Sequence, residues 1–240
     1  LAQIQPVLAP RSIIRTLRAQ RGHARSQDNQ GDRMLKLYTA KATIGLACEI
    51  ALEEAGAAYE VTRLSFADNE QRGDAYLAVN PKARVPSLET DQGVITEVPA
   101  ILGYVARTHP AASLAPGADD PFGLAQAESF MSYLCSWVHP AAAHRVRGNR
   151  WADDEAAIAE MRRKAPEVFG AALRLIDTTF FKGPWVLGER FSVCDPYLYV
   201  VSSWIPRDGL DWADYPRLTD HTARMNARPA VQAVLARVNG

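Results

Sequence analysis

Arg84-Val85-Pro86-Ser87-Leu88 decides the fold, because a proline stands where an apolar run otherwise reads as the start of a strand. Proline has no N–H for a sheet ladder, so a strand here begins at the proline or lies at an edge. With a cis Val85-Pro86 bond, the N–H and C=O of Val85 face outward and can pair with an extended, peptide-like ligand as an added strand. The trans form, which frequency alone favours, leaves an ordinary loop. The surrounding sequence has to decide between the two.

The composition is that of an ordinary globular protein. Of the 240 residues, 48% are hydrophobic and 22% charged, and the formal net charge is zero. Such a chain folds into one or two domains with sizeable cores. Because it has no excess of positive charge, we expect small-molecule ligands rather than nucleic acid or a membrane surface. No apolar run approaches the roughly 20 residues that cross a bilayer.

Three cysteines, Cys48, Cys135 and Cys194, show no C-x-x-C spacing. Their odd number and spacing argue against a disulfide framework, a structural zinc site and a dithiol redox motif. We therefore expect no metal and a reducing, cytoplasmic compartment.

Residues 1–33 differ from the rest, with six arginines against two acidic residues. Such an Arg-rich, acid-poor segment is either an organellar transit peptide or an upstream extension, natural or added, before a true start at Met34. We prefer the second interpretation, because a strand pattern begins directly after Met34. We expect residues 1–33 to be a disordered leader outside the fold.

The segment after Met34 has the pattern of a small α/β domain. Residues 35–39 alternate like a half-buried strand, residues 44–56 have helical spacing that ends at a glycine, and residues 59–64 form a second strand. This order predicts a parallel βαβ unit with a right-handed crossover. We then expect a short helix before Asn80, a strand at Val85-Pro86, a turn at 91–93, a strand through Ile95 and a helix from Pro99 to about Arg107. The whole order is that of a thioredoxin-like domain.

The remainder of the chain reads as helical. Pro121 suits the first turn of a long helix, and residues 153–181 form another, which we expect Pro166 to interrupt. Residues 195–204 and 216–237 supply the last helices. We predict a domain at 34–110, a Pro- and Gly-containing linker at 111–121 and an all-helical domain at 122–240.

A capping box precedes the third of these helices. In Ser192-Val193-Cys194-Asp195, the Ser192 oxygen is placed to accept from the Asp195 N–H while the carboxylate reaches back.

Seven short motifs follow one another from Met34 onward: Leu37-Tyr38, Ile50-Ala51-Leu52, Asn80-Pro81-Lys82, Val85-Pro86, Thr96-Glu97, Trp137-Val138-His139 and Ser203-Trp204. In these residues and their order the chain resembles a cytosolic glutathione S-transferase, most closely the bacterial beta-class type. The resemblance implies a thioredoxin-like domain that binds glutathione, followed by the all-helical domain of these transferases, in a homodimer.

The resemblance implies how glutathione binds. Val85 would make antiparallel main-chain hydrogen bonds to its cysteinyl part, and Pro86 would hold the geometry. Glu97 would pair with the γ-glutamyl ammonium, and the helix N-terminus that opens at Val98 would receive the carboxylate. Val98 departs from the family, which commonly has a serine here, so we expect weaker binding.

Basic residues have two interpretations. Lys82 or Arg84 would pair with the glycyl carboxylate by resemblance, although both are also typical solvated loop charges. The stretch 145–151, with three arginines and Trp151, either attracts an anionic co-substrate or is a solvated helix end.

The thiol-activating position breaks the pattern. Beta-class members carry a cysteine and then a serine where this chain has Ile44 and Gly45, so a mixed disulfide there is excluded. Thr43 and Thr39 are the remaining hydroxyls. A hydroxyl at a helix N-terminus can donate to a thiolate whose pKa the helix dipole lowers, and Thr43 is alternatively, or also, the N-cap. Cys48 is either a core residue or a redox residue.

The resemblance also implies a site for the second substrate. His139 would lie over the sulfur, where it steadies a thiolate, donates a proton, or simply packs. Tyr133, Ser136 and Trp204 would line a pocket for a hydrophobic electrophile, with core packing as the alternative for the aromatic rings.

We therefore predict a glutathione transferase that conjugates the thiolate to a hydrophobic electrophile between the domains. The alternatives are a glutathione-dependent disulfide reductase or peroxidase, and a non-catalytic protein that binds glutathione or hydrophobic ligands.

Overall fold

The structure is a computed structural model that describes residues 34–239. The prediction of a disordered leader at 1–33 lies outside the described residues. The strands are β1 (Leu35–Thr39), β2 (Tyr59–Arg63), β3 (Ser87–Thr90) and β4 (Gly93–Thr96). The helices are α1 (Gly45–Glu54), α2 (Asp74–Leu77), α3 (Val98–Thr108), α4 (Pro121–Tyr133), α5 (His139–Arg147), α6 (Glu155–Leu175), α7 (Cys194–Ser202), α8 (Pro216–Asn226) and α9 (Pro229–Asn239).

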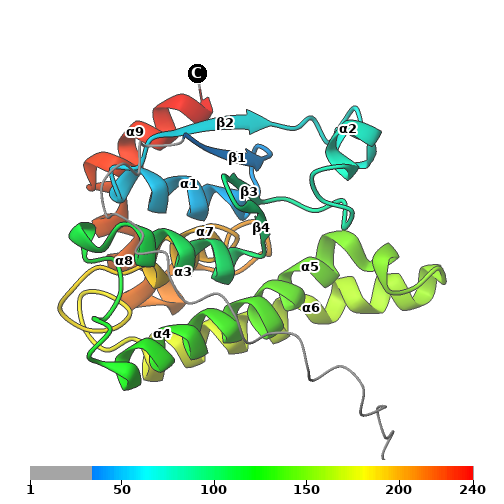
Figure 1. Cartoon of the computed structure of the whole chain (residues 1–240). Helices are drawn as coiled ribbons and strands as arrows, with labels where there is room; N and C mark the ends of the chain where they lie inside the picture. The colour runs from blue at the N-terminus through cyan, green and yellow to red at the C-terminus, as the bar shows by residue number, and fades with distance from the viewer. Residues whose placement is uncertain (1–33, 240) are drawn as a thin grey trace, which may run out of the picture. The chain divides into compact units, whose positions relative to one another are not determined.

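The four strands form one mixed sheet in the order β2-β1-β3-β4. β1 pairs in parallel with β2 and antiparallel with β3, where Leu37 stands opposite Leu88. Both leucines are fully buried. Helices α1 and α3 lie between the sheet and the helices α4 to α8 (Figure 1). The predicted βαβ unit is confirmed, as is the fold class: a thioredoxin-like part followed by helices.

The Val85-Pro86 bond is cis. Strand β3 begins directly after it, at Ser87, so the proline precedes the ladder instead of standing within it. The strand predicted at Val85-Pro86 therefore starts slightly later, and Val85 lies just outside the sheet.

The predicted interruption at Pro166 is wrong, because α6 runs unbroken from Glu155 to Leu175. Proline removes one helical hydrogen bond, but Ala165, Phe169 and Leu173 beside it are buried along one face. That burial outweighs the lost bond.

Two other predicted helices are divided. The long helix from Pro121 passes through a π-helical turn at Leu134–Val138 before α5 begins. The final segment is two helices, because α8 ends shortly before Pro229 opens α9.

Of the two hydrogen bonds predicted for the capping box of α7, the one that the Asp195 carboxylate accepts is confirmed. The Ser192 N–H donates to Asp195 Oδ2 over 2.7 Å, and the Val186 N–H donates to Oδ1 over 2.9 Å. The Ser192 hydroxyl oxygen accepts from the Cys194 N–H over 3.3 Å, one residue earlier than predicted. The start of α7 is thereby fixed within the core.

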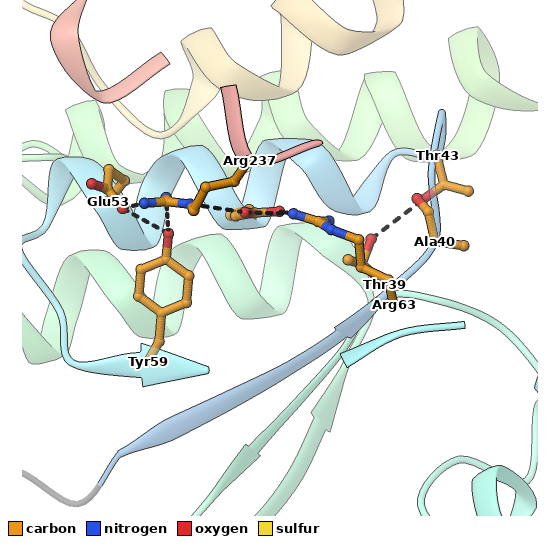
Figure 2. A network of polar contacts seen from close by, with 8 residues as sticks. Thr39, Ala40, Thr43, Glu53, Tyr59, Arg63 and Arg237 are labelled. Atoms are coloured by element: carbon orange, nitrogen blue, oxygen red, sulfur yellow. Dashed lines mark hydrogen bonds and ion pairs between the residues drawn. The ribbon is translucent and has the colours of Figure 1, made fainter. Parts of the chain in front are cut away.

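Helix α1 is tied to β2 and α9 by a network of charged side chains around the buried Glu49 (Figure 2). Arg63 donates to both oxygens of the fully buried Glu49 over 2.9 Å. Arg237 donates to Glu53 over 2.6 Å and to the Tyr59 hydroxyl over 2.7 Å. These contacts hold the helix whose first turn faces the site described below.

The predicted domains share one hydrophobic core. Leu37 and Ile50 of the first belong to the same buried cluster as Val138 and Leu198 of the second. The boundaries at 34–110, 111–121 and 122–240 remain predictions.

Candidate functional site

A cleft of about 750 Å³ gathers most of the residues that the sequence singled out. This volume suits a small molecule. Its wall includes Thr43, Lys82, Arg84, Val85, Pro86, Glu97, Val98, His139 and Trp204. Thr39, Tyr133 and Ser136 do not line it.

Val85 presents free backbone groups on this wall. Within residues 34–239, neither its N–H nor its C=O makes a hydrogen bond. The carbonyl of the preceding residue, Arg84, accepts from the Tyr76 hydroxyl over 2.5 Å and from Asn80 Nδ2 over 2.7 Å. The loop is thus held from behind, and Val85 is left as a short edge that can receive an extended peptide.

Glu97 occupies the N-cap position of α3 with φ of 73°, in the left-handed region. This conformation costs a non-glycine residue roughly 1–3 kcal/mol and is concentrated at functional sites. The Glu97 carboxylate forms an ion pair with Lys82 Nζ, which also donates to Thr96 Oγ1 over 2.6 Å. No side chain of the described part of the chain caps α3, so the Val98 N–H is available to an anion.

Thr43 lies on the wall, but its hydroxyl already has a partner. It donates to the Ala40 carbonyl over 2.7 Å (Figure 2). The N-cap position of α1 is Ile44, and none of the side chains that the structure describes caps this helix. The N-cap interpretation of Thr43 is therefore wrong.

Thr39 is only 1% exposed and packs beneath Thr43. Its hydroxyl lies 3.4 Å from Thr43 Oγ1, and because the Thr43 proton goes to Ala40, Thr39 is the donor of this pair. A Cβ on Gly45 would lie 2.0 Å from Thr39 Oγ1. Thr39 thus supports the first turn of α1 from behind and does not reach the cleft.

His139 contacts Trp204, with 4.9 Å between the ring centroids. Burial, with the positive charges of Arg147, Arg207 and Arg150, lowers the pKa of His139 to about 4. The imidazole is therefore neutral at pH 7 and acts on a ligand through neutral hydrogen bonds or packing, not as an imidazolium.

None of the three cysteines is a ready thiolate. Cys48 and Cys194 are buried, and burial raises the pKa of both thiols. Cys135 is exposed and lines the cleft, but partial burial and the charge of Glu97 raise its pKa as well. Of the two interpretations of Cys48, a core residue or a redox residue, its complete burial supports the first.

Cys135, in the π-helical turn that precedes α5, lines the wall, whereas Tyr133 and Ser136 do not. It lies four positions before His139, a spacing that places two side chains on one side of a helix. Tyr133 instead packs edge-on against Phe180 at 5.6 Å. Nothing in the sequence marks this turn.

Sequence reasoning also missed Tyr197. It lies in the apolar run of α7, is 1% exposed and lines the wall. Its hydroxyl makes no hydrogen bond within residues 34–239, and burial raises its pKa, so it is a neutral donor facing the cleft.

The stretch 145–151 contributes to the wall as well. Arg147, Arg150 and Trp151 line the cleft, together with Arg72 and Arg207 from elsewhere in the chain. Arg145 turns away and donates to the Asp208 carbonyl over 3.1 Å.

Neither a group of metal-binding side chains nor a membrane-spanning helix occurs among the described residues. Across 34–239, no three His, Cys, Asp or Glu side chains are grouped so that they could hold a metal ion. None of the described helices is long and apolar enough to cross a membrane.

Comparison with known proteins identifies the family. Residues 34–107 match the glutathione S-transferase N-terminal domain. The chain is 27% identical to glutathione S-transferase GST-4.5 of Xanthomonas campestris over 84% of this chain and 97% of that protein. The crystal structure of a Sulfitobacter glutathione transferase homologue with bound glutathione is 43% identical, with a TM-score of 0.82 over 85% of this chain and 98% of the other.

A second similar structure belongs to the bacterial beta class. The bacterial beta-class glutathione S-transferase of Sphingomonas chungbukensis is 32% identical, with a TM-score of 0.74 over 85% of this chain and 98% of the other. The chain belongs to the glutathione S-transferase family.

Proposed function

We propose that this glutathione transferase holds glutathione along Val85, with the thiol at the first turn of α1, and presents the thiolate to an electrophile near Trp204. The free backbone groups of Val85 carry the proposal, because they lie on one wall with Thr43 and Glu97. An extended tripeptide pairing with Val85 has a site for its thiol on one side and for its charged end on the other.

Glu97 and the start of α3 suit the γ-glutamyl end, which carries both an ammonium and a carboxylate. The ammonium would take the place of Lys82 at the Glu97 carboxylate. The carboxylate would accept from the free Val98 N–H at the positive end of α3. Lys82, once released, or Arg84 would be available for the glycyl carboxylate.

Thr43 would stabilise the thiolate by turning its hydroxyl from the Ala40 carbonyl to the sulfur. A hydrogen bond to an anion is about twice as strong as one between neutral groups, so the exchange is favourable. The dipole of α1 acts in the same direction. His139 is neutral beside this place and supports the bound ligand without adding a charge.

The sulfur chemistry is then that of glutathione rather than of the protein. The raised pKa values of Cys48, Cys135 and Cys194 leave each of them mostly protonated near pH 7. This favours conjugation over a route through a protein disulfide.

The test is the ultraviolet absorbance of the thiolate of bound glutathione as a function of pH. Thr43→Val removes the hydroxyl at nearly constant shape and should raise the pKa of the bound thiol by about 1. Thr43→Ser keeps the hydroxyl and should stay close to the wild type. An unchanged pKa in Thr43→Val would assign activation to the α1 backbone, and no binding at millimolar glutathione would refute the proposed function.

We also propose a cytoplasmic homodimer that accepts electrophiles with a hydrophobic body. The unpaired cysteines support a reducing compartment, and Phe66, Trp151 and Trp204 supply aromatic surface in the cleft. The dimer rests on the family resemblance. Light scattering that gave the mass of a single chain would contradict it.

A further inference from the structure

The cleft holds far more positive than negative charge. Among the described residues 34–239, six basic side chains line it, namely Arg72, Lys82, Arg84, Arg147, Arg150 and Arg207, against the single carboxylate of Glu97. We propose that the second substrate is an electrophile that carries a carboxylate or a similar anion, bound by Arg147 and Arg150. This inference rests on the proposed function and names the substrate class of the same site.

Two of the six cations already have partners. Lys82 pairs with Glu97. Arg207 donates to the fully buried Asp208 over 2.9 Å. Within residues 34–239, the side chains of the other four, Arg72, Arg84, Arg147 and Arg150, form neither a hydrogen bond nor an ion pair. They remain available to an anionic ligand.

The four arginines face a common space. Burial and the charges of Arg147, Arg84 and Arg72 lower the pKa of Arg150 to about 10. Burial and the charges of Arg84 and Arg207 lower the pKa of Arg147 in the same way. Like charges held together without a counter-charge are unfavourable, and a bound anion removes that cost.

Glutathione does not use all of these cations. One of its two carboxylates is assigned to the start of α3 and the other to Lys82 or Arg84, next to Val85. Arg147 and Arg150 come from the end of α5 and the turn after it, together with His139. They therefore belong to the part of the wall that receives the second substrate.

Trp151 suggests that the anion is joined to a flat, apolar body. Its ring stacks on His144 with 4.2 Å between the centroids and 26° between the planes, which holds it in place beside Arg150. An aromatic face next to guanidinium groups suits an aromatic or conjugated carboxylate.

The matched probes are 4-chloro-3,5-dinitrobenzoate and its methyl ester. In both, the glutathione thiolate attacks the carbon that bears chlorine, a carbon–sulfur bond forms, and chloride leaves with the bonding pair. The two reagents differ in one negative charge. Rates are divided by the uncatalysed rate of each reagent, and the binding of both glutathione conjugates is measured by calorimetry.

We expect the wild type to bind the carboxylate conjugate about tenfold more tightly than the ester conjugate, as charge-assisted, bidentate bonds to guanidinium groups allow. The preference should fall as salt rises and should be lost in R147Q/R150Q, while the affinity for glutathione itself is kept. The control R162Q/R190Q removes two exposed arginines that are outside the cleft wall and should keep the preference. The single variants R147Q and R150Q replace the double variant if it does not fold.

Equal binding of the two conjugates by the wild type would overturn this inference and leave the proposed function intact. A parallel loss of glutathione affinity in R147Q/R150Q would also overturn it, because these arginines would then serve glutathione. If neither glutathione nor either conjugate binds, the proposed function itself fails.

Discussion

His139 shows how the setting of a single residue restricts its chemistry. The sequence allowed it to be a proton donor, a support for the thiolate or a packing residue. Burial against Trp204 and the neighbouring arginines keeps the imidazole neutral, so donation from an imidazolium is unavailable at neutral pH. The same charges that suit an anionic substrate therefore decide the protonation of this histidine.

His139 should make the protein less stable in mild acid. The unfolded chain takes up the proton near pH 6.5 and the folded protein only near pH 4, so the unfolded state binds more protons between these values. The free energy of unfolding should fall as the pH drops through this window and not change on this account above it. Urea unfolding of the wild type and His139→Gln at pH 7 and pH 5 measures the effect. An equal loss in both proteins would contradict it.

At the scale of elements, α1 depends on a glycine in its first turn. Thr39 lies so close to Gly45 that an added Cβ cannot be accommodated without movement. Gly45→Ala should therefore lower the free energy of unfolding by roughly 1–3 kcal/mol and weaken glutathione binding. Thr39→Ala/Gly45→Ala removes the nearest atom, the Thr39 hydroxyl, and should recover part of both losses. Thermal unfolding and calorimetry test this, and a fully stable Gly45→Ala would contradict it.

The ion pairs of Glu49, in the middle of α1, give a second prediction at this scale. Arg63→Ala leaves the fully buried Glu49 carboxylate with only Arg237, whose Nε is 3.8 Å away. Loss of one partner of a buried pair costs about 3–5 kcal/mol, and we expect the lower end because Arg63 is 30% exposed. Arg63→Ala/Glu49→Gln, which removes the uncompensated charge, should be more stable than Arg63→Ala alone in chemical denaturation. The opposite order would mean that the pair contributes little.

At the scale of the whole molecule, the order of strands and helices along the first part of the chain and the start of β3 near Val85-Pro86 were predictable because their signals are local. Alternating residues mark β1, Gly56 ends the first helix, and a proline marks the start of β3. Packing alone decides which side chains near the π-helical turn line the cleft, and no local pattern marks them, so Cys135 was missed and Tyr133 and Ser136 were placed on the wall. That Arg72 and Arg150 line the same cleft could not be predicted from the sequence either, because it depends on tertiary packing between distant segments.

Arg72, Arg84, Arg147 and Arg150, whose side chains have no partner within residues 34–239, imply that this fold gives up stability for the sake of its ligand. Without a bound anion, their mutual repulsion works against the folded state, and any carboxylate introduced among them should relieve it. Arg150→Glu should therefore raise the melting temperature while it abolishes the preference for the carboxylate conjugate. Thermal unfolding in low salt, with R162E as the control for net charge, measures the first effect. In this region, engineering for thermostability and selection for catalysis would favour opposite substitutions.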